Sequence, residues 1–217
     1  WQKQRLTQFY TDLFTAQHQQ INEFLFTNFY DLSTLEMLAA QLQKALDQKI
    51  KLDRWLPNEI LNAILDGFEL ALTTLTTDSQ ITAYLLEHQL DVNHENVLKA
   101  LQVIDQFEAR AHQLTLLAKI AKVMHKFAHS FILRSALKFA QPKIEQRGFK
   151  PLYDYLDKSM QYIRTDQHNL RFFKTLVERE KVFLNYLRVE QPSHLYLTYD
   201  AKINTFIEAP RHNTDMC

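Results

Sequence analysis

The chain has 217 residues, of which 46% are hydrophobic and 23% charged, and its 25 basic residues balance its 25 acidic ones. This composition is that of a globular protein and not of a disordered one. Two glycines are too few for turn-rich β folds or for glycine-rich nucleotide-binding loops, so these classes are disfavoured. An all-α protein is the class that remains.

Hydrophobic periodicity predicts a multi-helix bundle of about seven to eight helices. The predicted helices span residues 2–14, 18–30, 33–49, 57–76, 79–90, 95–140, 151–163 and 167–188. Asp31 and Ser33 are helix-start residues, and Ser33 with Glu36 fits a capping box. Pro57 suits a first helical turn, and Asp78 and Asn93 are further helix-start residues.

Residues 95–140 are long for one globular helix, so we expect a bend or break near 105–112. Pro142 and Gly148 then interrupt the helical pattern. After Pro192, apolar and polar residues alternate on both sides of Asp200, which allows a small C-terminal β-hairpin.

We expect a single helical domain over 1–190 and a partly ordered C-terminal extension over 191–217. The single cysteine, Cys217, permits no intrachain disulfide, which fits a reducing compartment, and we expect a cytoplasmic protein. No uncharged apolar stretch is long enough to predict a membrane-spanning helix.

The neutral total charge conceals a strong polarity along the chain. Residues 61–109 hold one basic residue against eight acidic ones, and residues 110–150 hold nine basic residues against one acidic one. On a helical wheel, Lys119, Lys122 and Lys126 lie opposite a broad apolar arc, so 117–140 is a basic amphipathic helix. Either this helix associates with an anionic membrane surface, or it packs beside the acidic segment of its own chain.

Few residues form patterns typical of catalysis or of a metal site. His125 and His129 are four residues apart, which places both rings on one helix face and makes them weak metal-ligand candidates. No glutamate of a zinc-protease motif lies between them, and the chain holds no nucleophile elbow. We therefore assign no catalytic residues and no cofactor.

Aromatic and aliphatic side chains are the candidates for binding an apolar ligand, such as a lipid or fatty acyl chain, between helices. These candidates are Phe24, Leu25, Phe29, Tyr30, Phe127 and Phe131. The alternative is that they are ordinary core residues. Near the C-terminal helix, Glu178–Lys181 is a solvated charged face, or else Arg179 or Glu178 points inward and pairs across the bundle.

Four short elements resemble the FFLEELY family of bacterial proteins. They are Phe24–Tyr30, Arg110-x-x-Gln113-Leu114, Gly148-Phe149-x-x-Leu152 followed by Leu156, and Phe173 with Val177-Glu178-Arg179-Glu180. Thr27 and Asn28 replace both glutamates of the naming motif, so no role for those carboxylates is carried over. The resemblance covers roughly residues 6–188 and implies an all-helical bacterial protein without an assigned activity.

The favoured function is a non-catalytic module that binds a protein partner or itself as a homodimer. The alternatives are a binding protein for an apolar ligand, or peripheral membrane association through 117–140. Nucleic acid is the weakest outside partner, because no aromatic residues are interleaved with the lysines and the pI is only 7.3.

Overall fold

A computed structural model describes residues 1–15, 18–20, 22–23, 26, 31–47, 57–165, 168–189, 197–200 and 205–208. The described residues form eight helices and two short strands. The helices are α1 (Gln2–Phe9), α3 (Leu32–Asp47), α4 (Asn58–Glu87), α5 (His94–Val103), α6 (Phe107–His129), α7 (Phe131–Gln146), α8 (Lys150–Thr165) and α9 (Asn169–Val189). The predicted all-α class is confirmed.

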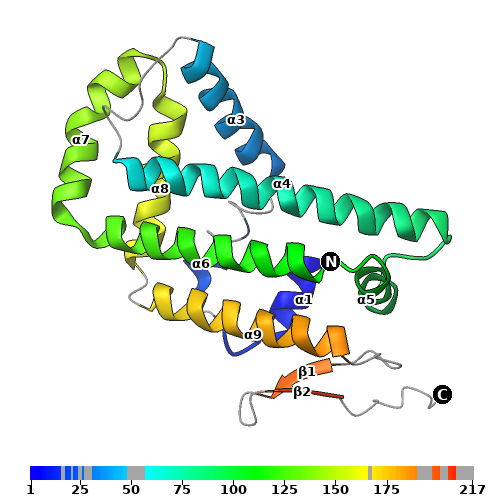
Figure 1. The fold of residues 1–217 in the computed structure, drawn as a ribbon. Coiled ribbons are helices and arrows are strands. Elements are labelled where there is room, and N and C mark those ends of the chain that lie inside the picture. Colours follow the sequence, from blue (N-terminus) through cyan, green and yellow to red (C-terminus); the bar gives the residue numbers. More distant parts are fainter. Residues whose placement is uncertain are drawn as a thin grey trace, which may run out of the picture.

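Helix α6 is the centre of the bundle. Figure 1 shows α6 between α4 and α9, with α8 crossing α4 and α6, and α7 at the outer edge of the molecule. The main core contains α6 residues such as Leu114, Ile120 and Phe127, which are 4–9% exposed. Because α6 packs against α4, α8 and α9, most of its circumference is covered by other helices.

The acidic helix α4 is continuous over 30 residues, so the two predicted helices 57–76 and 79–90 are one. Asp78 does not cap a new helix. Its carboxylate instead accepts a hydrogen bond from Arg110 of α6 at 2.6 Å, and the neighbouring Thr77 hydroxyl donates back to the Thr73 carbonyl at 2.9 Å. Asp78, predicted as a helix start, therefore makes a tertiary contact within the continuous helix.

The long segment 95–140 contains two breaks. Asn93 caps α5 by accepting from the Asn96 amide at 2.9 Å, and the expected break follows α5, where Asp105 has a φ of 54°. The second break was not predicted and lies at Ser130, whose side chain accepts from the Leu133 amide and begins α7. The predicted helix 117–140 is thus divided between α6 and α7.

Pro142 lies inside α7 and does not end it, contrary to the prediction. Proline removes one hydrogen bond, to the carbonyl four residues earlier. Pro142 and Lys138 are both on the exposed side of the helix, so water can satisfy that carbonyl. Helix α7 ends instead at Gly148, where φ is 75° and the Gly148 amide bonds to the Glu145 carbonyl.

Helix α3 begins at Leu32 and is capped by Asp31, one of the two predicted helix-start residues, and not by the Ser33–Glu36 box. The Asp31 carboxylate accepts from the Ser33 amide at 3.3 Å and from the Thr34 hydroxyl at 2.7 Å. These hydrogen bonds lower the pKa of Asp31. Ser33 lies inside the first turn of α3, and its hydroxyl donates to Asp31.

Two antiparallel strands lie near the C-terminus, β1 (Leu197–Asp200) and β2 (Thr205–Glu208). Leu197 pairs with Glu208 and Asp200 with Thr205. Strand β1 contacts α1 and strand β2 contacts α9, and Figure 1 shows the pair beside α9.

Candidate functional site

Helices α4 and α6 are joined by a row of acid–base pairs, called here the α4–α6 ladder. Its four pairs run antiparallel along the two helices with N···O distances of 2.6–2.8 Å: Glu59–Lys126, Asp66–Lys119, Glu69–His112 and Asp78–Arg110. The opposite charges of the two sequence segments therefore meet inside one molecule. In the Glu59–Lys126 and Glu69–His112 pairs both side chains are about half exposed, so each of these pairs contributes only about 0–1 kcal/mol.

The α4–α6 ladder includes two of the three lysines that were predicted to form a basic surface. Lys119 and Lys126 face α4, as in the alternative where the two charged segments pair internally. Lys122 is exposed, and no ion pair involves it among the residues that the structure describes. The three lysines therefore do not form one outward-facing basic surface.

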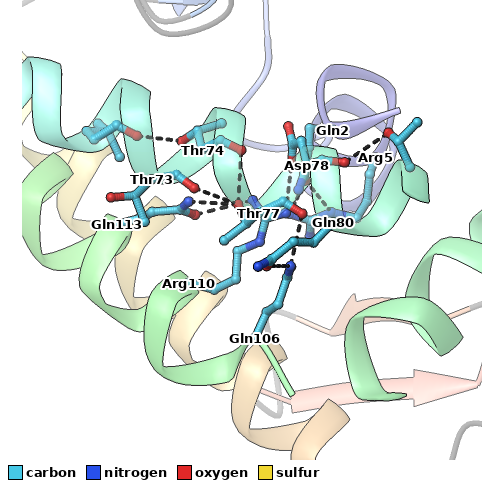
Figure 2. Close-up of polar contacts among 12 residues, drawn as sticks. Gln2, Arg5, Thr73, Thr74, Thr77, Asp78, Gln80, Gln106, Arg110 and Gln113 are labelled. Carbon is cyan, nitrogen blue, oxygen red and sulfur yellow. Dashed lines mark hydrogen bonds and ion pairs between the residues drawn. The ribbon is translucent and has the colours of Figure 1, made fainter. Parts of the chain in front are cut away.

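The ladder ends in a buried polar cluster around Thr77, shown in Figure 2. Arg110 is only 7% exposed and donates to both Asp78 and Gln113, at 2.6 and 3.3 Å. The Gln113 amide donates to the Thr77 hydroxyl at 3.2 Å, and Gln106 donates to the Thr77 carbonyl at 3.0 Å. The Arg110-x-x-Gln113 element of the sequence is therefore a hydrogen-bonded clamp between α6 and α4.

A second buried network joins α1 to α9. Arg5, which is 4% exposed, donates to both carboxylate oxygens of Glu180 at 2.8 and 2.5 Å. The Tyr10 hydroxyl donates to the same carboxylate at 2.7 Å. Burial, followed by the Glu180 charge, raises the pKa of Tyr10 well above its usual range, so the phenol stays protonated.

Arg179 points inward and pairs with Asp12 through two hydrogen bonds of 2.7 Å. This bidentate contact lowers the pKa of Asp12. The neighbouring Glu178 is exposed and lies 3.9 Å from Lys174, one turn away. Of the two inward candidates, the structure therefore places Arg179 in the bundle and Glu178 at the surface.

A cavity of about 90 Å³ lies between the two networks, lined by Arg5, Arg110 and Glu180 among others. Two buried nitrogens, Trp1 Nε1 and Arg110 Nε, have no hydrogen-bond partner within the described part of the chain. Since a water molecule occupies about 30 Å³ in the liquid, the cavity has room for a few waters that could bond to these donors.

His94 lies beside this region, with its ring 5.7 Å from the Trp1 ring and 5.1 Å from the Phe9 ring, measured between centroids. Burial lowers the pKa of His94 to about 4, and the Arg5 charge acts in the same direction. The imidazole is therefore neutral at pH 7.

The predicted metal pair is held by other contacts. The His125 and His129 rings are 4.5 Å apart, and His125 Nδ1 lies 2.8 Å from the side-chain oxygen of Asn169. Burial and then the neighbouring His125, Arg134 and Arg164 charges lower the pKa of His129. Among the described residues, no group of three or more His, Cys, Asp or Glu side chains is placed to hold a metal ion.

The candidate ligand residues do not share one described pocket. Phe24, Leu25, Phe29 and Tyr30 lie outside the described residues, whereas Phe127 is 4% exposed in the core and Phe131 is 74% exposed. Phe131 leaves the predicted apolar arc because the chain turns at Ser130. The apolar cavities beside Phe127 and beside Gly67 measure about 20 and 40 Å³, far below the roughly 300 Å³ of a typical ligand pocket.

A cavity of about 330 Å³ lies at the start of α9 and is lined mainly by polar side chains. Its lining residues are Asp12, Leu13, His18, His168, Arg171, Phe172, Thr175 and Arg179. Such a lining does not match an acyl chain.

Two exposed apolar faces were missed by the sequence analysis. The first, called the α4 seam, consists of Leu61, Leu65, Phe68, Leu72, Leu75, Ser79, Thr82 and Leu86. Leu61 and Phe68 are half-buried and pack partly against the core, and the other six residues are exposed. These residues are spaced alternately four and three positions apart in the sequence. The spacing was not recognised because two separate helices were predicted on either side of Asp78. The second, called the α7 face, consists of Phe131, Ile132 and Phe139 with Lys138 and Lys143.

A family model described as "Domain of unknown function (DUF8198)" matches residues 1–194. The chain belongs to this family. No curated protein and no solved structure matches the chain.

The family match extends from α1 to the end of α9. Both buried networks, the α4–α6 ladder and the two exposed faces therefore belong to the DUF8198 domain. Among the helices described, none is long and apolar enough to cross a bilayer.

Proposed function

We propose that this protein is a non-catalytic interaction module that self-associates through the α4 seam. The observation that carries the proposal is an apolar row along α4 in which Leu65, Leu72, Leu75 and Leu86 face away from the core. Leu65, Leu72 and Leu86 are 57%, 67% and 74% exposed, while the buried residues of α4, such as Leu70, face α6.

The spacing of the seam favours another helix as the partner. Its residues alternate steps of four and three from Leu61 to Leu86, which averages 3.5 residues per turn. This repeat keeps one stripe of side chains facing a second helix, as in coiled coils. Ser79 and Thr82 are the polar members of the row, and both are small enough to lie in a helix–helix contact.

A second copy of α4 suits this stripe because the seam carries no charged residue. Two uncharged seams meet without repulsion, and the neighbouring acidic residues Asp66 and Glu69 are already paired with α6. The zero net charge of the chain removes long-range repulsion between copies.

The seam limits the strength of the contact. At 1.5 Å per residue and a helix diameter of about 10 Å, it offers about 400 Å² per copy. The resulting total of about 800 Å² is below that of a standard stable interface. We therefore expect a reversible dimer whose population rises with protein concentration.

Sedimentation velocity over a wide concentration range tests this proposal. Wild type should shift from monomer to dimer, and the double variant Leu65→Asp/Leu72→Asp should stay monomeric, because each charge would be buried in the contact. Val92→Asp is the matched control, since Val92 is 72% exposed and lies outside the seam.

Circular dichroism should show equal helix content in all three proteins, because the substituted residues are exposed. A wild type that stays monomeric throughout, or a double variant that dimerises like wild type, would overturn the proposal.

A further inference from the structure

The α7 face holds some of the most exposed apolar side chains of the described residues. Phe131, Ile132 and Phe139 are 74%, 77% and 86% exposed. Helix α7 lies at the outer edge of the molecule (Figure 1) and packs against α6 and α8 through its other side, where Ile144 is buried. A phenylalanine as exposed as Phe139 contributes nothing to the core.

Basic residues border this apolar group. On a helical wheel at 100° per residue, Lys138 and Lys143 lie on opposite sides of Phe139. No ion pair involves either lysine among the residues that the structure describes. From 131 to 150 the chain holds five basic residues and one acidic residue, Glu145, so the local charge is strongly positive.

We propose that the α7 face binds the surface of an anionic lipid bilayer, with α7 lying parallel to the membrane plane. Phe131, Ile132 and Phe139 then enter the boundary between headgroups and acyl chains. Lys138 and Lys143 extend beside them to the lipid phosphates, since long basic side chains keep their charge at the interface while their stems stay apolar. The positive charge of the segment matches the negative potential of the membrane.

Two lysines of α6, Lys119 and Lys126, are less suited to the proposed contact. Lys119 and Lys126 are paired with carboxylates of α4 at 2.8 and 2.6 Å. They are therefore less available to lipid phosphates than Lys138 and Lys143. The bend at Ser130 separates the two groups, so the proposed membrane surface is α7 alone and not the continuous helix predicted over 117–140.

Vesicle flotation tests the proposal, with vesicles of phosphatidylcholine alone or mixed with phosphatidylglycerol. Wild type should float only with the anionic vesicles, and added salt should weaken this binding. Phe139→Ser should reduce the bound fraction roughly tenfold, because one inserted aromatic ring is lost. Lys138→Glu/Lys143→Glu should abolish flotation.

Two variants serve as matched controls. Leu72→Ser removes an apolar side chain that is 67% exposed but lies on the uncharged α4 seam. Lys122→Glu reverses an exposed lysine on α6. Both should float like wild type.

Three outcomes would overturn the proposal. Wild type that does not float with phosphatidylglycerol vesicles shows no such binding. Phe139→Ser that floats as well as wild type shows an unspecific electrostatic attraction, which an acidic protein would satisfy equally. Loss of flotation in Lys122→Glu would place the contact on α6.

Discussion

Among the residues that the structure describes, Arg5, Arg110 and Arg179 are buried, and each meets a carboxylate. Arg5 and Arg179 each donate twice to one carboxylate, and Arg110 bonds to Asp78 and Gln113. The planar guanidinium can satisfy several acceptors at once, which a lysine ammonium cannot do with the same geometry. The sequence elements Arg110-x-x-Gln113 and Arg179-Glu180 are therefore explained as structural clamps between helices.

Gly67 offers a residue that can be improved. It lies in the interior of α4, where glycine costs about 1 kcal/mol relative to alanine, and a Cβ at this position would meet no atom within 4 Å. Gly67→Ala should therefore raise the free energy of unfolding by about 1 kcal/mol and Tm by about 2–4 °C. Calorimetry measures both.

Gly148→Ala is the control for this prediction. Gly148 has a φ of 75°, and its Cβ would collide with the Lys44 ammonium. This variant should lose about 1 kcal/mol or more. Equal effects of the two substitutions would contradict the argument.

His94 should make stability depend on pH. Its folded pKa of about 4 lies below the unfolded value of 6.5, so as pH falls the unfolded chain binds the proton first. The contribution of His94 to the free energy of unfolding is fully present above about pH 6.5 and is lost as pH falls toward 4. With allowance for solvent screening of this partly exposed ring, the loss is about 1–2 kcal/mol.

Urea unfolding of wild type and His94→Gln at pH 7 and pH 5 measures this loss. The difference in stability between the two pH values should be smaller in the variant. The same difference in both proteins would show that other groups cause the pH dependence.

At the scale of single elements, Ser130 sets the direction in which α7 leaves α6. It ends one helix and caps the next through its side chain. Ser130→Ala should cost about 1 kcal/mol, the usual value of an N-cap, and Ser130→Asp should preserve stability. Thermal unfolding of the three proteins provides the comparison, and an alanine variant as stable as wild type would refute the role of the cap.

The elements also show where pattern reading succeeds. Asn93 could be predicted because asparagine is a typical cap residue, and the break near Asp105 could be predicted because residues 95–140 are too long for one globular helix. Asp78 and Ser130 misled the prediction in opposite ways. A polar residue in mid-helix resembles a cap when its partner, here Arg110, comes from a distant segment, and a single serine gives too weak a signal to break a long helix.

For the whole molecule, the scarcity of glycine and the helical periodicity were sufficient to predict the all-α class. The charge polarity along the chain could be predicted too. The partners of the charged residues could not, because the register between α4 and α6 is a tertiary property. The α4 seam and the α7 face could not be recognised as exposed for the same reason. An apolar row in a helical sequence does not show whether the row is buried in the core. Which rows the core buries depends on the packing of all helices.

The α4–α6 ladder constrains how related sequences can diverge. Its register pairs positions 59, 66, 69 and 78 with positions 126, 119, 112 and 110. A substitution that reverses the charge on one helix places like charges together, so it is tolerated only with the opposite substitution on the other. Among members of this family, the paired positions should therefore change together, and such covariation would reveal the antiparallel contact of α4 with α6 from sequences alone.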